Sequence, residues 1–322
     1  MAEKQYNDQT ISSLKGADRV RKRPAVIFGS EGLEGCEHSF FEILSNSIDE
    51  AREGYGKEIV VTVYQDRTIE VDDHGRGVPL DFNKKENRYN WELVYCELYA
   101  GGKYENNEID SVYKFSLGTN GLGACATQYS SEFMDVYSFK GDTLYEIHFE
   151  KGEPASELIV RPLERKQKRT GTLTRWRPDL EVFTETKIPK ERFLDILHKQ
   201  AVVNKGLKLV LVYEEENGSL STTEFYYENG ISDYISELAG EKSLTAPYIW
   251  DMKAKGRDRD DKEDYELKAE ICFCVSNTVN QLEYYHNSSF LEHGGSPANA
   301  VRRAFTFEID KYLAENNKYL KK

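Results

Sequence analysis

An acid and an amide lie four residues apart in a stretch of this chain that reads FFEILSNSIDEARE, residues 40–53. The apolar residues recur at helical spacing, so Glu42 and Asn46 are predicted on one helix face, one turn apart. A carboxylate beside an amide oxygen suits a polarised water next to a hard cation such as magnesium, which prefers oxygen ligands. A solvated polar stripe on a surface helix is the alternative, and the motifs downstream favour the chemical interpretation.

A carboxylate at the end of a predicted strand is the second feature, in the segment DDHGRGVP at residues 72–79. Asp73 could accept a hydrogen bond from the exocyclic amine of adenine. Guanine presents an oxygen at that position, so a buried acid would reject it. Gly75 and Gly77 let the backbone turn tightly and approach a flat base. Taken alone, this motif is also compatible with an ordinary turn.

Two glycine-rich loops could bind phosphate. In AGGKY, residues 100–104, Lys103 offers a positive charge; in LGTNGLG, residues 117–123, a glycine loop opens a predicted helix and exposes unpaired N–H groups. The second loop is not a Walker motif, because no Lys-Ser or Lys-Thr follows, and no strand precedes it as in a dinucleotide fingerprint. Thr172, in the segment RTGT, could share a hydrogen bond with the adenine-binding carboxylate.

The elements that must position these residues alternate between helices and short strands. After Glu228 the sequence predicts a different set of elements: a short helix, a charged hairpin tip, the strand EICFCV and a last helix. That last helix would have Ser296 as its N-cap and Pro297 at its first position. The basic run Arg165–Arg169 is interpreted as an exposed hairpin loop, since no aromatic residues interleave with it. Before Glu228 we expect strands within 57–73, 133–176, 207–213 and 222–227, a polar loop at 83–90, and helices at 91–99 and 189–203.

Composition limits the class of protein. The 322 residues are 39% hydrophobic and 31% charged, enough for one large or two moderate domains with a polar surface. A net charge of −13 argues against a domain that wraps nucleic acid by itself, though not against a part of a larger DNA-acting machine. Five cysteines without framework spacing and no long apolar run predict a cytoplasmic chain without a membrane partner. We expect Cys272 and Cys274 to be buried thiols rather than a metal pair.

Taken in this order, the segments resemble those of the Bergerat-fold ATPases, which include gyrases, large heat-shock chaperones, sensor histidine kinases and mismatch-repair proteins. The match is closest to the B subunits of type IIA topoisomerases, DNA gyrase and topoisomerase IV. It implies an α+β fold: a two-layer α/β sandwich whose mixed, mostly antiparallel sheet is covered by helices, over residues 1–228. An N-terminal dimerisation arm would occupy about residues 1–20, and part of an α/β transducer domain residues 229–322. Its landmarks are LKGADRVRKRPAVIFG, FFEILSNSIDEA, DDHGRGVP, YAGGKY, NGLGA, RTGTLTRWRP and HGGSPANAVRRAF.

The resemblance also implies a role for each matching residue. Glu42 would be the general base and Asn46 the ligand of Mg²⁺, the cofactor of ATP. Asp73 would bind adenine with Thr172, and Arg76 would pair with Glu50, which with Asp49 supports the site. The full nucleotide-binding set would be Tyr6 from a second subunit, Asn46, Glu50, Asp73, Gly75, Arg76, Gly77, Pro79, Lys103, Gly118, Thr119, Asn120, Gly121, Leu122, Gly123 and Thr172.

The function that the resemblance implies is an ATP-driven dimer clamp that captures a DNA segment, with the A subunit and a second copy of itself as partners. No QTK-like segment occurs, so we expect the transducer lysine and the TOPRIM region beyond Lys322, and weak ATP hydrolysis without them. His74, Lys140 and the LGTNGLG loop depart from the family pattern and indicate a divergent branch, either gyrase, topoisomerase IV or a specialised relative. The alternative is a nucleotide-sensing dimerisation module with little turnover; kinase-type and chaperone functions are disfavoured.

Overall fold

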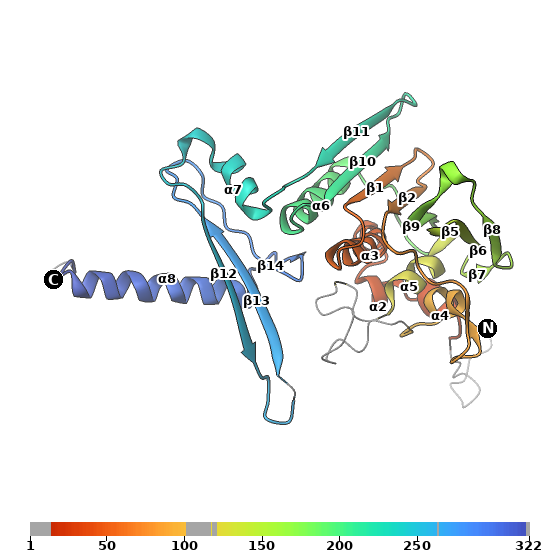
Figure 1. Cartoon of the computed structure of the whole chain (residues 1–322), viewed down its shortest axis with the longest axis horizontal. Helices are drawn as coiled ribbons and strands as arrows, with labels where there is room; N and C mark the ends of the chain where they lie inside the picture. The colour runs from red at the N-terminus through yellow and green to blue at the C-terminus, as the bar shows by residue number, and fades with distance from the viewer. Residues whose placement is uncertain (1–13, 101–116, 118–120, 263, 320–322) are drawn as a thin grey trace, which may run out of the picture. The chain divides into compact units, whose positions relative to one another are not determined.

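The computed structural model describes residues 14–100, 117, 121–262 and 264–319. The chain divides into two compact units, one of residues 1–201 with 206–228, the other of residues 202–205 with 229–322. Figure 1 colours the chain from red at its N-terminus to blue at its C-terminus, so that the second unit is mainly blue.

The first unit is built on one mixed sheet in the order β11-β10-β1-β2-β9-β5-β6-β7, with β8 also paired to β6. Strands β1 and β10 run parallel, whereas the other neighbours in this sheet are antiparallel. The strands are β1 (Glu58–Val63), β2 (Ile69–Asp73), β5 (Ser131–Gly141), β6 (Thr143–Glu150), β7 (Glu153–Pro154), β8 (Ile159–Pro162), β9 (Arg169–Pro178), β10 (Lys208–Glu214) and β11 (Leu220–Phe225).

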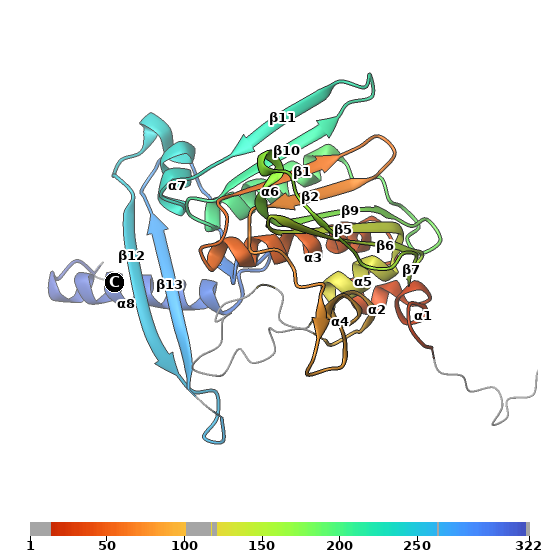
Figure 2. The same cartoon turned by 45° about the vertical axis from the view of Figure 1, so that its right-hand side comes forward.

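Helices lie on one side of this sheet, as Figure 2 shows. The predicted α+β class, a mixed and mostly antiparallel sheet covered by helices, is therefore confirmed. The elements are α1 (Asp18–Arg21), α2 (Pro24–Phe28), α3 (Leu33–Arg52), α4 (Asn90–Cys96), α5 (Gly123–Tyr129), the 3-10 turn η2 (Arg165–Gln167) and α6 (Lys190–Val203). The polar loop expected at 83–90 instead contains a small hairpin, β3 (Phe82–Asn83) with β4 (Arg88–Tyr89).

Strand periodicity directs Asp73 toward the helical layer. In β2 the alternate residues Ile69, Val71 and Asp73 are buried, as Ile59 and Val61 are in the neighbouring β1. Because successive side chains of a strand point to opposite faces, Asp73 lies on the same face as the two apolar residues before it. The carboxylate thus enters the interface between sheet and helices, where α3 packs.

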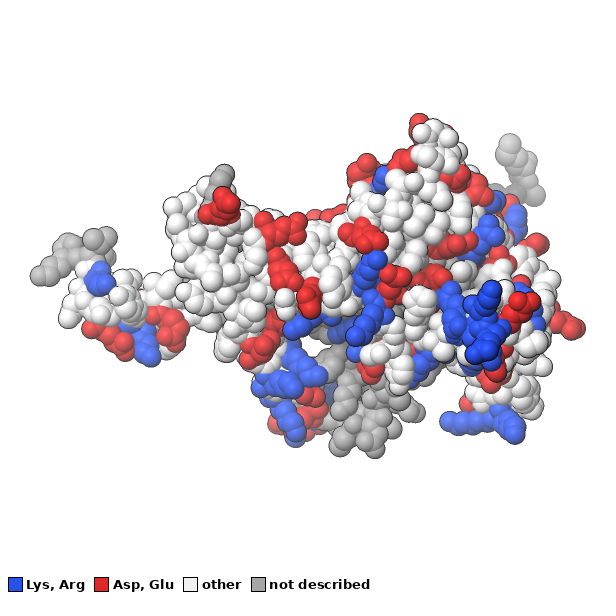
Figure 3. All heavy atoms as spheres, turned by 45° about the horizontal axis from the view of Figure 1, so that its top comes forward, with Lys and Arg blue, Asp and Glu red and all other residues white. Residues whose placement is uncertain are grey.

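The surface is strongly charged, as expected for a chain in which 31% of the residues are charged and the net charge is −13. On the face drawn in Figure 3, Asp and Glu side chains are widespread, and Lys and Arg gather in smaller groups between them. Among the residues that the structure describes, no helix is both long and apolar enough to span a bilayer.

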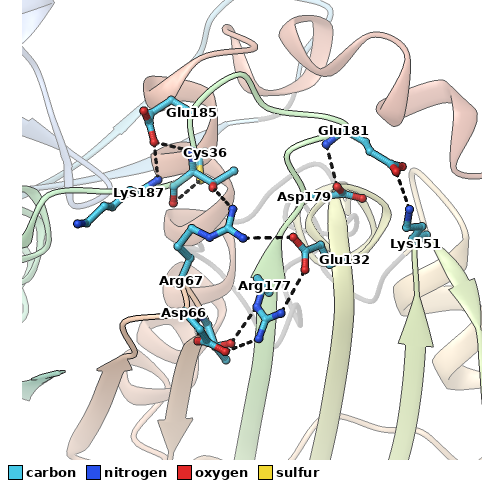
Figure 4. A network of polar contacts seen from close by, with 12 residues as sticks. Cys36, Asp66, Arg67, Glu132, Lys151, Arg177, Asp179, Glu181, Glu185 and Lys187 are labelled. Carbon is cyan, nitrogen blue, oxygen red and sulfur yellow. Dashed lines mark hydrogen bonds and ion pairs between the residues drawn. The ribbon is translucent and has the colours of Figure 1, made fainter. Parts of the chain in front are cut away.

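A polar network joins the β1–β2 turn to the segment before α6, at the opposite end of β2 from Asp73 (Figure 4). Arg67 donates to the Oγ1 atom of Thr186 over 2.8 Å and lies 3.5 Å from Glu132. Arg177 pairs with Glu132 at 3.2 Å and with Asp66. These contacts join the turn before β2 to β5, to β9 and to the segment before α6.

The second unit contains a long hairpin and a final helix. Its elements are α7 (Ile231–Ala239), η3 (Gly240–Lys242), β12 (Tyr248–Gly256), β13 (Tyr265–Phe273), β14 (Tyr285–His286), β15 (Ser289–Phe290) and α8 (Gly295–Glu315). The charge run does form the turn between β12 and β13, as predicted.

Three expectations for other segments need correction. Helix α8 has Gly294 as its N-cap, so Ser296 is not the cap; Gly294 and Gly295 both adopt positive φ and turn the chain into the helix. Cys272 and Cys274 are partly exposed, because β12 and β13 form a sheet of only two strands. In the Arg165–Arg169 run, Arg169 is not part of an exposed loop but begins β9 and is partly buried.

Candidate functional site

Asp73 is held by hydrogen bonds from three parts of the fold. Its Oδ1 atom accepts from the backbone N–H of Gly75 and from that of Thr172 on β9, both at 2.9 Å. Its Oδ2 atom accepts from the hydroxyl of Ser47 on α3 at 2.8 Å. The turn that follows β2, the neighbouring strand and the helix therefore all fix this one carboxylate.

The arrangement leaves Asp73 able to accept one more hydrogen bond. Within the described part of the chain Oδ2 accepts only from Ser47, whereas a carboxylate oxygen can accept two bonds. Asp73 is 4% exposed, and burial raises the pKa of its carboxyl against the effect of its three donors. A buried acceptor with remaining capacity suits the N–H donor of a ligand, as an amino group on a base would provide.

The turn after Asp73 requires its glycines. Gly77 has φ +82°, and a Cβ atom there would lie 2.8 Å from both the carbonyl of Phe139 and the hydroxyl of Ser138. The next residue, Val78, donates from its N–H to Thr172 Oγ1 at 3.0 Å and accepts from Ser138 at 2.7 Å. Thr172 thus serves both the carboxylate and the turn, while Pro79 at the end of the turn is exposed.

Glu42 and Asn46 lie together on α3, as the sequence predicted. The Nδ2 atom of Asn46 donates to the backbone carbonyl of Glu42 over 3.0 Å, which orients the amide. The Glu42 carboxylate lies against the start of α5, where a Cβ atom on Gly123 would come within 2.0 Å of its Oε2 atom. The glycine loop therefore ends directly at the proposed general base, and Gly121 and Leu122 precede that contact in the chain.

His38 is a site residue that the sequence reasoning missed. Its Nε2 atom lies 3.3 Å from Glu42 Oε1 and its Nδ1 atom 3.2 Å from the carbonyl of Phe28. Because both ring nitrogens face acceptors, the doubly protonated imidazolium is favoured. The hydrogen bond to Glu42 accordingly raises the pKa of His38, and burial opposes it. The spacing of His38 and Glu42, one helical turn, was the signal available in the sequence.

Glu50 and Arg76 form the ion pair that was expected. Arg76 uses Nε at 2.9 Å and a terminal nitrogen at 2.8 Å, one to each carboxylate oxygen, in a bidentate pair. Its guanidinium lies 4.2 Å above the ring of Tyr55. Nearby, Asp49 accepts from the N–H of Leu117 at 2.7 Å, so the start of the glycine loop is bound to α3.

Two of the positions that depart from the family pattern, His74 and Lys140, lie fully within the described part of the chain. His74 is exposed. Lys140 lies 4.0 Å from Asp81 and 5.2 Å from the ring centroid of Tyr145.

Five predicted site residues fall outside the described part of the chain: Tyr6, Lys103, Gly118, Thr119 and Asn120.

The donor set on α3 fits the magnesium ion that the resemblance implies. Since Nδ2 of Asn46 is committed to a carbonyl, the amide is oriented with its oxygen as the atom for a cation. Mg²⁺ takes few protein ligands and completes its shell with water and phosphate oxygens, so one amide oxygen is a sufficient anchor. No group of three or more His, Cys, Asp or Glu side chains in the described residues is arranged to hold a metal by itself.

Comparison with known proteins finds B subunits of DNA gyrase among the relatives of this chain. Residues 230–322 match the family model of DNA gyrase B. The chain is 32% identical to the B subunit of DNA gyrase from Mycoplasma genitalium over 98% of this chain and 48% of that protein. The corresponding gyrase protein of Staphylococcus aureus is 32% identical over 95% and 46%. The chain thus spans about half the length of the curated relatives that it matches.

A solved structure shows the same fold. The 43K ATPase domain of Thermus thermophilus gyrase B, in complex with an aminocoumarin, has a TM-score of 0.72 at 27% identity, over 96% of this chain and 76% of that one. The fold is therefore that of a gyrase B ATPase domain. In sequence, the chain is similar to the B subunit of DNA gyrase over about half of that protein's length.

Proposed function

We propose that this chain binds and hydrolyses ATP as the N-terminal part of a type IIA topoisomerase B subunit. One observation carries the proposal: Asp73, with remaining acceptor capacity, is hydrogen-bonded to the same helix that presents Glu42 and Asn46. Glu42 lies five residues before Ser47 on α3, roughly 7.5 Å along the helix axis. One bound nucleotide could therefore meet Asp73 with its base and Glu42 with its phosphates.

Base selection follows from the charge and burial of Asp73. An adenine amino group would donate to the Oδ2 atom, whereas the guanine oxygen at the same position would face a buried carboxylate. The resulting mismatch leaves an acceptor unpaired and places two negative atoms together, so adenine is preferred. Ser47, Gly75 and Thr172 hold the carboxylate before the base arrives, which lowers the cost of ordering it.

Glu42 acts as the general base. Its carboxylate takes a proton from the water that attacks the γ-phosphate, and His38 holds that carboxylate in place by donating to Oε1. Gly123 allows the helix start to approach the carboxylate, so that backbone N–H groups lie near the phosphates. Mg²⁺, when bound by Asn46 and the phosphates, offsets the charge that develops on the leaving group.

The proposed function also covers the domains of this chain and the partners of the whole B subunit. We assign residues 1–228 to the nucleotide-binding domain, with the arm and Tyr6 reaching a second copy, and residues 229–322 to part of the transducer. ATP would favour the closed dimer because it binds that state better than the open one. DNA and the A subunit are the proposed further partners. The five free cysteines accord with a proposed location in the cytoplasm.

Calorimetric titration tests the nucleotide preference. The chain should bind ADP and a non-hydrolysable ATP analogue in the presence of Mg²⁺, and bind GDP at least about 30-fold more weakly, as expected when a buried polar group loses its partner. Equal affinity for the adenine and guanine nucleotides would remove the base-recognition argument.

A measurement of phosphate release distinguishes an ATP-hydrolysing enzyme from the alternative, a nucleotide-sensing module. Glu42→Gln should retain ADP binding but reduce the rate of hydrolysis about 100-fold or more, the usual contribution of a general base. Glu34→Gln, in the first turn of the same helix, is the matched control and should change neither quantity. Undiminished turnover in Glu42→Gln would exclude Glu42 as the base. Because hydrolysis by this chain alone is expected to be weak, the sensing module is tested on the full-length B subunit, where absence of turnover would favour it.

A further inference from the structure

Arg169 makes contacts around Asp73 that the proposed function does not use. Its terminal nitrogens donate to both carboxylate oxygens of Asp72, to Oδ2 at 2.9 Å and to Oδ1. One of them also donates to the backbone carbonyl of Asp73 at 2.7 Å. The guanidinium lies 4.4 Å from the ring centroid of Phe139, which supports it from one side.

These bonds lie where the pairing of β2 with β9 stops. The register of the two strands ends with Asp72 opposite Leu173, so the strand that carries Asp73 has no further pairing with β9. Gly171 nevertheless approaches closely, since a Cβ atom there would come within 2.0 Å of the Asp73 carbonyl oxygen. The Arg169 side chain therefore bridges the strands one residue beyond the last paired residues.

We propose that Arg169 is a positioning residue that fixes the end of β2 and so aims the Asp73 carboxylate at the adenine amino group. The inference rests on the proposed function, because it assigns Arg169 to the same site. Arg169 and Asp72 are each only about a quarter exposed, 26% and 25%, so solvent screens their interaction less than it screens an exposed pair. The planar fork reaches three acceptors at once, which a single ammonium group does not do in the same geometry.

Electrostatics supports this placement. Burial raises the pKa of Asp73, and the negative charge of Asp72 raises it further. Arg169 compensates that charge and so favours the ionised form of Asp73, which is the form that accepts from an amino group. The same guanidinium thus fixes the backbone of Asp73 and compensates the charge of its neighbour.

Strand β9 offers a matched control. Arg175 pairs with Glu70 of β2 at 3.3 Å and lies 5.9 Å from the rings of Tyr64 and Phe133. It is thus a second arginine on the same pair of strands, bonded to an acid of β2 and flanked by aromatic rings. Glu70, the partner of Arg175, lies three residues before Asp73 in the chain, toward the start of β2. Arg175 therefore differs from Arg169 in its distance from the proposed site.

The experiment compares Arg169→Met, Arg169→Lys and Arg175→Met by calorimetry with three ligands. The ligands are ADP, the diphosphate of purine riboside, which lacks the amino group, and tripolyphosphate. In Arg169→Met the affinity for ADP should fall about tenfold, the preference for ADP over the purine analogue should fall by a similar factor, and tripolyphosphate should bind as in wild type. Arg169→Lys should recover part of that preference, and Arg175→Met should match wild type.

Several outcomes would overturn the inference. An unchanged amino-group preference in Arg169→Met would do so, as would an equal loss in Arg175→Met. Equal weakening of ADP and tripolyphosphate would indicate a general structural role instead. Recovery of ADP affinity in Asp72→Asn/Arg169→Met would show that Arg169 acts through charge alone and does not position the strand. If wild-type protein does not prefer ADP over the purine analogue, the proposed function fails along with the inference. If wild-type protein has this preference and Arg169→Met keeps it, only the inference is contradicted.

Discussion

The hydroxyl of Ser47 donates to the Oδ2 atom of Asp73 over 2.8 Å. This bond joins α3, which carries Glu42 and Asn46, to the end of β2, which carries the adenine-binding candidate. The base side and the phosphate side of the proposed site are therefore linked through one buried contact, in which Ser47 is 6% and Asp73 4% exposed. Several consequences of this arrangement can be measured.

Removing the Ser47 hydroxyl should weaken nucleotide binding. Ser47→Ala leaves Asp73 with one donor fewer, so we expect a loss of about 1 kcal/mol in the free energy of unfolding and a fall in ADP affinity of about fivefold. Ser39→Ala is the matched control: Ser39 is buried in the same helix and donates to the carbonyl of Cys36 at 2.7 Å, away from Asp73. Similar ADP titrations for the two variants would contradict the role given to Ser47.

Asp73→Asn should separate binding from stability. The Asn oxygen can accept from Gly75 and Thr172, and its amide can donate to the Ser47 oxygen, so all three contacts persist. We expect unfolding free energy within about 1 kcal/mol of wild type. ADP affinity should fall at least about 30-fold, because an amide N–H would then face the adenine amino group. Retained affinity in a folded variant would exclude Asp73 as the base acceptor.

Wild-type protein and Asp73→Asn should also differ in how their free energies of unfolding depend on pH. The folded-state pKa of Asp73 is raised above its ordinary value of 3.8 by burial, so the folded state binds a proton more readily than the unfolded state. Wild-type stability relative to Asp73→Asn should therefore increase as pH falls from the raised value toward 3.8, and decrease as pH rises through that window. Urea unfolding without nucleotide measures the difference; an opposite slope would show that the hydrogen bonds outweigh burial.

His38 should titrate above its ordinary pKa of 6.5, because its hydrogen bond to Glu42 favours the charged ring. The stabilisation from this pair should be fully present below pH 6.5 and lost as pH rises through the folded-state pKa. Nuclear magnetic resonance of the ring protons gives that pKa directly. In Glu42→Gln it should decrease, and a pKa that stays the same would mean that the pair does not form in solution.

Two glycines with positive φ should respond differently to alanine. Gly77 and Gly141 have φ +82° and +70°, but only at Gly77 would a Cβ atom meet neighbours, at 2.8 Å. Gly141→Ala should cost about 1 kcal/mol of stability from backbone strain alone. Gly77→Ala should cost roughly 2–4 kcal/mol, because the turn must also move. Urea unfolding of both proteins checks the difference, and equal losses would refute the close approach.

The sequence predicted the main elements where local pattern and packing agree. Alternation in β2 predicted a strand that ends at Asp73, and the helical spacing around Glu42 predicted α3, although its start at Leu33 was missed. Glycine spacing likewise predicted the turn after Asp73, and the sequence after the glycine-rich segment predicted the helix that begins at Gly123. In each case a periodic pattern within a few residues carried the information.

Contacts between residues far apart in the sequence were harder to predict. The bond from Ser47 to Asp73 spans 26 residues and that from Arg169 to Asp73 spans 96. No local pattern encodes such pairs, and the basic run at 165–169 was therefore interpreted as exposed. The partly exposed Cys272 and the earlier start of α8 have the same origin, since both depend on which neighbours the fold supplies.

The decisive measurement is a crystal structure of the chain with Mg²⁺ and a non-hydrolysable ATP analogue, because it locates both ends of the nucleotide at once. We predict the adenine amino group about 3 Å from Asp73 Oδ2, the metal on the Asn46 amide oxygen, and the Glu42 carboxylate facing the γ-phosphate. An analogue whose base lies away from Asp73, or whose terminal phosphate lies away from Glu42, would contradict the proposed site.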